Sequence, residues 1–406
     1  MDAPHLDVRS SKSKIMAAAV GKMLTRRLAF RSQLMGSIER SALHMGNAEF
    51  REKKERFLVA PATRGWYVVC LSKELKHKPL RKRLMGMPIV LFRSKEGIVG
   101  ALLDRCPHRN VPLSLGRVVE YQIECRYHGW QFDVCGNRVR VPGLCGRPEK
   151  KEGLVPSFPT REQDGFVWVY GTPGTDPKVE PFRVPERDSE GYATVYRVGE
   201  IKGSLFATVE NALDVPHTAF LHRGLFRGTG EPQGIKAVIT RYTDRIEVEY
   251  LGERPPKGLA ARFLTSSEEI MTHVDRFILP SITQVEYRLG EKGHLTTFLC
   301  TPVEDFLTKV FAVFQFRMGL PAWLMKLLMT PVVKRVIRQD ADMLKEQTET
   351  VIHFGEERFT STELDVLGLQ IWRLMRHADL GPSPTMNGSD GQAPGEGARF
   401  EIEIKI

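Results

Sequence analysis

The pattern of apolar and polar positions first separates a β-rich segment at residues 65–170. Short apolar runs such as GWYVVCLS and PIVLF are interrupted there by glycine, proline and charged residues. Runs of this length that are rich in β-branched and aromatic side chains are typical of strands. We therefore predict a small all-β domain. Its expected strands are residues 65–69, 88–92, 98–103, 118–125, 131–134, 137–141 and 165–170.

A second β-rich segment follows, and its turns are charged or contain glycine, which predicts an antiparallel sheet. Its expected strands are residues 194–198, 235–242, 245–250, 268–278, 283–289, 293–301 and 309–316. Helix-like patterns cover residues 205–220, 322–354 and 364–377, with a kink or restart expected at Pro331. The apolar run 320–333 in the long helix is either a surface that touches a membrane or a buried stem.

The two ends of the chain carry weaker signals. From Arg9 to Gly36 there are seven Lys or Arg and no acid, and residues 15–35 predict a basic amphipathic helix. Such a helix could lie on a membrane, act as a transit peptide, or pack as an arm on the body or a partner. Residues 379–397 have the composition of a disordered segment. The last residues alternate and could form an edge strand or a frayed tail.

These patterns give four parts: an arm at residues 1–55, a β domain at 56–171, a second domain at 183–378 and a flexible tail at 379–406. A length of 406 residues suits two domains. The net charge of +10 suits an acidic electron-transfer protein, an anionic membrane, or solubility alone. No nucleic-acid partner is expected. The six Cys show no disulfide framework, and we see neither a secretory signal nor a long apolar run, so the expected location is the cytoplasm.

The richest motif lies in the first β domain. Cys106-x-His108 is followed, after sixteen residues, by Cys125-x-x-His128. Pro107 and the Gly-Trp pair after His128 place both pairs on tight loops. Two thiolates and two imidazoles suit either zinc or a [2Fe–2S] centre in which two His replace two Cys on one iron. A zinc ribbon is the simpler alternative, although its common ligand spacings differ.

This stretch resembles the cluster motif of Rieske non-haem iron oxygenases, and the resemblance extends over residues 65–350. It implies an α+β protein in which an all-β Rieske domain precedes a helix-grip domain, an antiparallel sheet that holds a long helix. The Rieske proteins of respiratory complexes have an additional Cys in each loop. Val111 and Tyr127 stand at those places here, which favours the oxygenase branch.

A second constellation follows at residues 210–222, which read ENALDVPHTAFLH. His217 and His222 are five apart, so on a regular helix they would differ by about 140° at roughly 100° per residue. Both can bind one metal only if the turn is broken, and Pro216 makes a break plausible. Non-haem Fe(II) sites of this kind add a carboxylate to two His. The family pattern on the long helix selects Asp340 as that Fe²⁺ ligand, with Asp342 as the alternative.

The resemblance also implies roles and partners. Asp214 would link His217 to the cluster ligand His128 of the next subunit in a homotrimer, because a head-to-tail contact can close into a ring. Asn211 would support the iron pocket, or else cap or pack a helix. The remaining histidines lack such neighbours and are treated as non-ligands: His5, His44, His77, His273, His294, His353 and His377.

The expected activity is oxidation of a hydrophobic small molecule with O₂ by hydroxylation, demethylation or desaturation. No dinucleotide-binding fingerprint is found, so electrons from NAD(P)H would arrive through a separate reductase or ferredoxin. Two alternatives remain. One is the α subunit of an aromatic-ring dihydroxylating dioxygenase, and the other is a Rieske electron-transfer protein without catalytic iron. Peripheral contact with a membrane is a further possibility.

Overall fold

A computed structural model describes residues 61–144, 154–186, 191–223, 234–253, 271–378 and 398–405. All of these belong to one of the two compact units of the chain, Leu58–Ile406. The predicted arm, its basic helix and most of the predicted tail lie outside the described residues.

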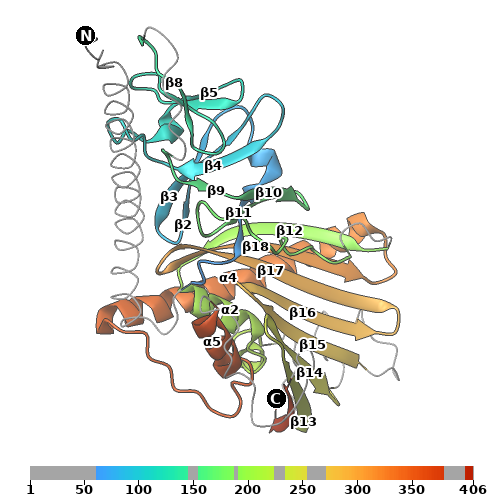
Figure 1. The fold of residues 1–406 in the computed structure, drawn as a ribbon. Coiled ribbons are helices and arrows are strands. Elements are labelled where there is room, and N and C mark those ends of the chain that lie inside the picture. Colours follow the sequence, from blue (N-terminus) through green and yellow to red (C-terminus); the bar gives the residue numbers. More distant parts are fainter. Residues whose placement is uncertain are drawn as a thin grey trace, which may run out of the picture. The chain divides into compact units, whose positions relative to one another are not determined.

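The first domain consists of three small antiparallel sheets, ordered β1-β11-β10, β2-β3-β4-β9 and β5-β6-β7-β8 (Figure 1). Its strands are β1 (Trp66–Leu71), β2 (Leu80–Leu84), β3 (Met87–Arg93), β4 (Val99–Leu103), β5 (Arg117–Val119), β6 (Gln122–Glu124), β7 (Gln131–Phe132), β8 (Arg138–Arg140), β9 (Ser157–Phe158), β10 (Thr160–Gln163) and β11 (Phe166–Tyr170). The predicted all-β domain is confirmed, while β2, β9 and β10 were not predicted.

One predicted strand of this domain was wrong. Residues 118–125 form two strands, β5 and β6, which pair as a hairpin. The turn between them contains Glu120 with a φ of 53°. Few residues other than Gly, Asn or Asp adopt that conformation, so nothing in the sequence marked a turn there.

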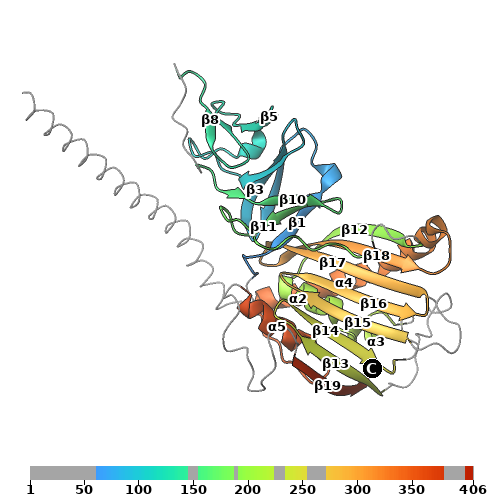
Figure 2. The same ribbon diagram turned by 45° about the vertical axis from the view of Figure 1, so that its right-hand side comes forward.

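The second domain is built on an eight-stranded antiparallel sheet with the order β12-β18-β17-β16-β15-β14-β13-β19 (Figure 2). Seven strands follow the prediction closely, because each apolar run ends at a charged or glycine-containing turn. The strands are β12 (Ala193–Ile201), β13 (Gly234–Arg241), β14 (Arg245–Leu251), β15 (Met271–Ile278), β16 (Ile282–Leu289), β17 (Lys292–Glu304), β18 (Leu307–Arg317) and β19 (Ala398–Lys405).

The described end of the chain is an edge strand, and it corrects the prediction of a flexible tail for residues 398–405. β19 pairs with β13 over its whole length, for example Ile402 with Ala237. Ile404 is buried in the core beside Val366 and Ile371. The alternation of apolar residues therefore reports a half-buried strand.

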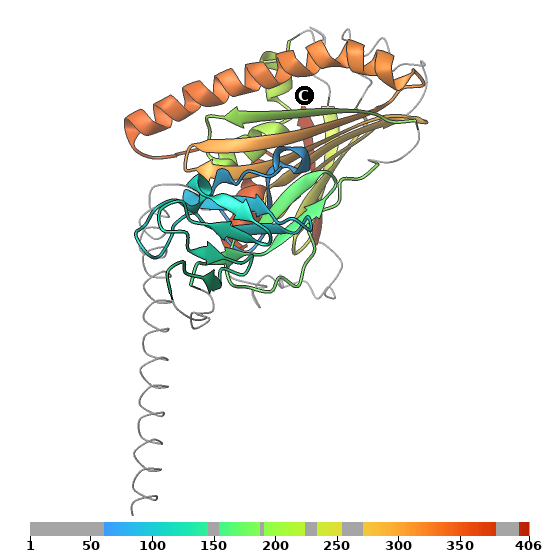
Figure 3. The same ribbon diagram turned by 90° about the horizontal axis from the view of Figure 1, so that it is seen from above.

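Within the part of the chain that the structure describes, four helices lie on one face of this sheet (Figure 2): α2 (Leu205–Leu213), α3 (His217–Phe220), α4 (Ala322–Phe354) and α5 (Gly368–His377). α4 runs lengthwise beside the edge strand β12 (Figure 3). The expected restart at Pro331 is absent, since α4 is one helix over all its 33 residues. Pro331 and Leu327, whose carbonyl loses its amide donor, are both exposed, so water can replace that donor.

The opposite face of the sheet packs against the first domain. Trp66, Phe166 and Trp168 share a buried cluster with Ile282 and Phe311. Thr301 Oγ1 also donates to the carbonyl of Val68 at 2.5 Å. The face of the sheet that carries the helices is therefore the one on which His217, His222 and Asp340 lie.

Candidate metal centres

The two Cys-His pairs lie on two loops of similar construction. In each loop the Cys amide donates to the carbonyl five residues later, and the Cys carbonyl accepts from the amide four residues later. The residue at the fourth position has a left-handed conformation in both loops, Asn110 with φ 60° and Gly129 with φ 66°. Asn and Gly are the residues that adopt this conformation most readily, so the local sequence builds both loops.

The four side chains form two pairs. Cys106 and Cys125 are each 2% exposed. Burial, together with the neighbouring Cys125, raises the pKa of the Cys106 thiol to about 11 in the absence of a metal. The rings of His108 and His128 lie 4.4 Å apart, and His108 stacks on Trp130 at 4.6 Å. His108 Nδ1 is buried without a hydrogen-bond partner, as a ligand atom would be.

This pairing distinguishes a cluster from a single zinc ion. Zinc needs four ligand atoms around one point, whereas a cluster with two His on one iron needs a thiolate pair and an imidazole pair. Within the described residues, three or more ligand atoms gather around one point only at His217, His222 and Asp340. The Cys and His pairs therefore fit a two-iron group better than a mononuclear ion.

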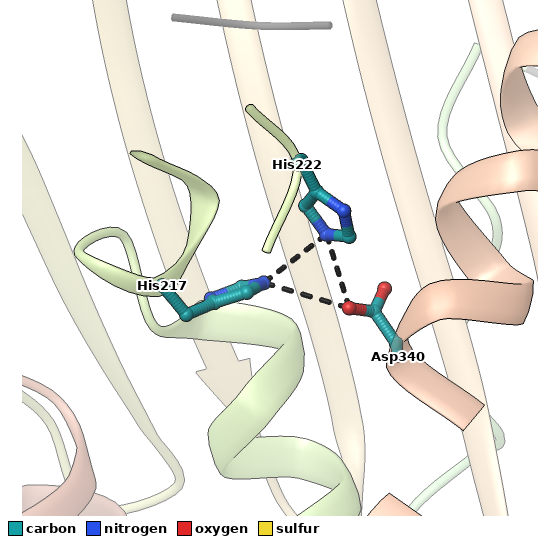
Figure 4. A group of neighbouring side chains, drawn as sticks. All are labelled: His217, His222 and Asp340. Atoms are coloured by element: carbon teal, nitrogen blue, oxygen red, sulfur yellow. Dashed lines mark hydrogen bonds and ion pairs between the residues drawn. The ribbon is translucent and has the colours of Figure 1, made fainter. Parts of the chain in front are cut away.

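The second site depends on a break between α2 and α3. α2 ends at Leu213, and Asp214 is extended with a ψ of 104°. Pro216 then precedes the single turn of α3, which begins at His217. His222 follows just beyond α3, and its Nε2 atom lies 3.3 Å from Nε2 of His217 (Figure 4). The expected break therefore brings two imidazoles five residues apart to one point.

α4 supplies the third group. Asp340 Oδ1 lies 3.0 Å from His222 Nε2 and 3.6 Å from His217 Nε2 (Figure 4). Ligands at about 2.1 Å from one metal and at right angles are about 3.0 Å apart, so these spacings suit a facial triad. Oδ1 is also buried without a regular hydrogen bond. The residues present thus fit a divalent iron.

In the triad, the His217 imidazole and the Asp340 carboxylate each shift the pKa of the other toward the charged form. Burial opposes a charge on His217, but Asp214 and Asp340 outweigh it and raise the pKa of His217 to about 9. Burial also disfavours the Asp340 carboxylate, yet the two imidazoles lower its pKa overall. A cation at this point would take the place of the proton that the metal-free site attracts.

Each imidazole has an orienting partner on its other nitrogen. Nδ1 of His217 contacts the backbone carbonyl of Asp214 and lies 3.5 Å from its carboxylate. Nδ1 of His222 lies 3.0 Å from Oε1 of Gln339. Because carbonyl and amide oxygens only accept, both contacts place a proton on Nδ1 and leave Nε2 free for a metal. Gln339 was not predicted, since no spacing rule marks it.

The structure places the other three predicted residues as follows. Asp342, the alternative ligand, is 72% exposed and pairs with Arg338. Asn211 is half-buried in the last turn of α2, whose N-cap is Ser204, so Asn211 is not a cap. Asp214 is the C-cap of α2 and lies three residues before His217. This is a position from which its carboxylate can reach His217.

Sequence reasoning did not single out a half-buried carboxyl next to Asp214. Glu210 lines one pocket together with Asp214, Asp365 and Tyr250. Burial, and then the charges of Asp214 and Asp365, raise the pKa of Glu210 to about 7. Glu210 stands one turn before Asp214 in the sequence, and this i, i+4 spacing was the available signal.

His273, treated as a non-ligand, occupies the interior of the sheet. Its Nδ1 lies 2.6 Å from Glu253 and its Nε2 lies 3.1 Å from Asp275. Tyr250 and Tyr287 stack on its two faces. Both nitrogens are thus taken by carboxylates on opposite sides, which leaves no lone pair directed at a common metal.

Two protein families match this chain, and together they cover both sites. The Rieske [2Fe-2S] domain matches residues 65–159, and the vanillate O-demethylase oxygenase C-terminal domain matches residues 205–378. The chain combines a Rieske domain with an oxygenase domain of the vanillate O-demethylase type. These two domains imply a [2Fe–2S] cluster in the first domain and iron in the second.

Relatives of this chain include the oxygenase component of dicamba O-demethylase from Stenotrophomonas maltophilia, 38% identical over 39% of this chain and 47% of the relative. The vanillate O-demethylase oxygenase subunit of a Pseudomonas species is 24% identical over 76% of this chain and 92% of the relative. The chain spans about half the length of the first curated relatives it matches. The crystal structure of dicamba monooxygenase bound to 3,6-dichlorosalicylic acid matches with a TM-score of 0.65 and 25% identity, covering 79% of this chain and 98% of that one.

Proposed function

We propose that this chain is a Rieske oxygenase, which uses O₂ and externally supplied electrons to hydroxylate, demethylate or desaturate a hydrophobic small molecule. The carrying observation is the triad of His217, His222 and Asp340, whose ligand atoms meet in a chain that also has both Cys-His pairs. When bound, the mononuclear iron would supply open positions for O₂, and the cluster would supply electrons. The two O-demethylase relatives support demethylation within this range.

Each residue then has a defined task in this proposal. Cys106, Cys125, His108 and His128 hold the cluster. His217 and His222 present Nε2 to the iron while their Nδ1 protons are held by Asp214 and Gln339. Asp340 contributes the charge that balances a divalent cation. Asn211, at the end of α2, supports the turn that places Asp214, whose amide donates to the Asn211 carbonyl at 3.3 Å.

We further propose that the chain forms a head-to-tail homotrimer in which His128 of one subunit meets Asp214 of the next. The cluster loops expose Arg105, Arg109 and Arg126. The pocket beside Asp214 carries the carboxyl groups of Glu210 and Asp365. Opposite charges on the two surfaces favour this contact. Asp214 would then accept hydrogen bonds from His217 and from the neighbouring His128.

The electron donor in this proposal is a separate reductase or ferredoxin that draws on NAD(P)H. The net charge of +10 supports an acidic donor. A reducing compartment such as the cytoplasm suits the five described cysteines, none of which forms a disulfide. Among the described helices, none is long and apolar enough to cross a membrane.

The deciding experiment measures iron, labile sulfide and the EPR spectrum of the reduced, purified protein. The proposal requires about three irons and about two sulfides per chain. Asp340→Ala should lose about one iron, keep the cluster signal and lose substrate oxidation, whereas Asp342→Ala should keep all three. Two irons with two sulfides in the wild type after reconstitution would indicate an electron carrier. Zinc without sulfide would refute both metal assignments.

A further inference from the structure

The exposed side of α4 changes in character along its length. Near its start, Trp323 is 68% exposed and Leu327 is 65% exposed, with Leu320 and Leu328 each at 38%. Trp323 and Leu327 are four residues apart and share one face of α4. Leu328 is next to Leu327, and Leu320 lies just before the helix, so both extend this apolar surface. From the sequence, residues 320–333 could be either a surface that touches a membrane or a buried stem. Met325 and Val333 are buried against the sheet, while the residues named first face water.

The same side becomes basic and then acidic toward the C-terminus. Lys334, Arg335 and Arg338 follow the apolar residues and are exposed. From Gly319 to Gln339 there are four Lys or Arg and no acid. Beyond Asp340 the exposed residues include Asp342, Glu346 and Glu349. The apolar end is thus followed, about 10 Å along the axis at about 1.5 Å per residue, by a cluster of positive charges.

We infer that the N-terminal end of α4 docks on an anionic lipid bilayer. Trp323, Leu327 and Leu328 would enter the boundary between headgroups and acyl chains, which such surfaces reach to a depth of about 5–10 Å. Lys334, Arg335 and Arg338 would then lie at the level of the lipid phosphates. The acidic end of the helix would remain in water, because negative charges are repelled by an anionic surface.

The composition of this surface favours lipid over a second subunit. Lys326 lies among the exposed apolar residues and is itself exposed. Lysine is depleted at the centres of protein interfaces, whereas at a bilayer its long side chain can extend toward the phosphates. Asp340 lies on the same helix as this surface. The distance from Trp323 to Asp340 along the helix axis is about 25 Å at about 1.5 Å per residue. The inference does not depend on the oxygenase chemistry proposed above.

The test is co-sedimentation of the full chain with phosphatidylcholine vesicles, with and without phosphatidylglycerol. The wild type should bind only the anionic vesicles, and added salt should weaken binding. Trp323→Gln with Leu327→Gln should lower the affinity about tenfold or more, because apolar burial is lost. Lys334→Gln and Arg335→Gln should each lower it about fivefold, which corresponds to about 1 kcal/mol per charge.

Ile352→Gln is the matched control, since Ile352 is 59% exposed on the acidic end of the same helix. It should leave vesicle binding unchanged. Light scattering of each variant reports the mass of the assembly, and iron and sulfide contents report intact folding. Failure of the wild type to bind would overturn the inference. So would equal binding by the Trp323 and Leu327 variant, or a loss of assembly mass in that variant, which would make this surface a subunit contact.

Discussion

The Nδ1 atom of His222 lies 3.0 Å from Oε1 of Gln339, although 117 positions separate the two residues in the chain. Gln339 immediately precedes Asp340 on α4. One turn of helix therefore offers both a candidate ligand to the metal and the acceptor that orients another ligand. This relationship leads to the first prediction.

Gln339→Ala should weaken metal binding at the triad by about tenfold to 100-fold, because His222 loses the acceptor that fixes its ring and tautomer. Anaerobic titration of the metal-free site with Co²⁺ measures this directly and does not depend on turnover. Gln339→Glu keeps an acceptor and should restore most of the affinity. Asp342→Ala, an exposed change on the same helix, should have no effect. Equal affinities for Gln339→Ala and the wild type would remove the positioning role.

Asp214→Asn should leave both metal centres loaded and slow substrate oxidation by about tenfold to 100-fold, because the proposed link between His217 and the next subunit loses its carboxylate. The measurement is the rate of cluster oxidation after mixing reduced protein with substrate and O₂. Asp365→Asn removes a charge from the same pocket and controls for local electrostatics. Turnover of Asp214→Asn near the wild-type rate would contradict the bridging role.

Glu210→Gln should change the pH dependence of stability. The pKa of Glu210 is raised to about 7 by burial and by Asp214 and Asp365. The folded state therefore binds an additional proton, and the contribution of this group is lost as the pH rises through about 7. At about pH 8 the buried charge costs up to about 3 kcal/mol.

The variant should therefore unfold at a higher temperature than the wild type at about pH 8, and at a similar temperature at about pH 5. Thermal unfolding over this pH range checks the prediction. Glu249→Gln, an exposed change on β14, serves as the control. A difference that is the same at both pH values would show that Glu210 does not titrate in this range.

Gly116→Ala should destabilise the cluster domain by about 2 kcal/mol or more. A Cβ atom at Gly116 would overlap the backbone carbonyl of Glu124, the residue before Cys125. Denaturant unfolding and the visible absorption of the cluster report the effect. Gly199→Ala is the matched control, since its Cβ would meet nothing within 4 Å. An equal loss of unfolding free energy in both variants would show that replacing any glycine has this effect, and that the contact with Glu124 is not its cause.

The two cluster loops could be predicted in detail because they are local. Each loop places a Cys, a His and a left-handed residue within six positions, and its backbone hydrogen bonds close within the loop. The strands around them follow from apolar runs and turns. The exceptions are β2, β9 and β10, which were not predicted, and the hairpin at Glu120, where the turn uses a residue that carries no turn signal.

By itself, the sequence determined the two β-rich domains, the seven strands β12 to β18 of the second domain, the break at Pro216 and the candidates His217, His222 and Asp340. Only the tertiary structure decided that Asp340 rather than Asp342 meets the imidazoles, that Gln339 orients His222, and that Glu210 is half-buried beside Asp214. These outcomes depend on how α4 is rotated against the sheet and against α3. That rotation is set by packing between residues far apart in the chain, and neither residue spacing nor local propensity contains it.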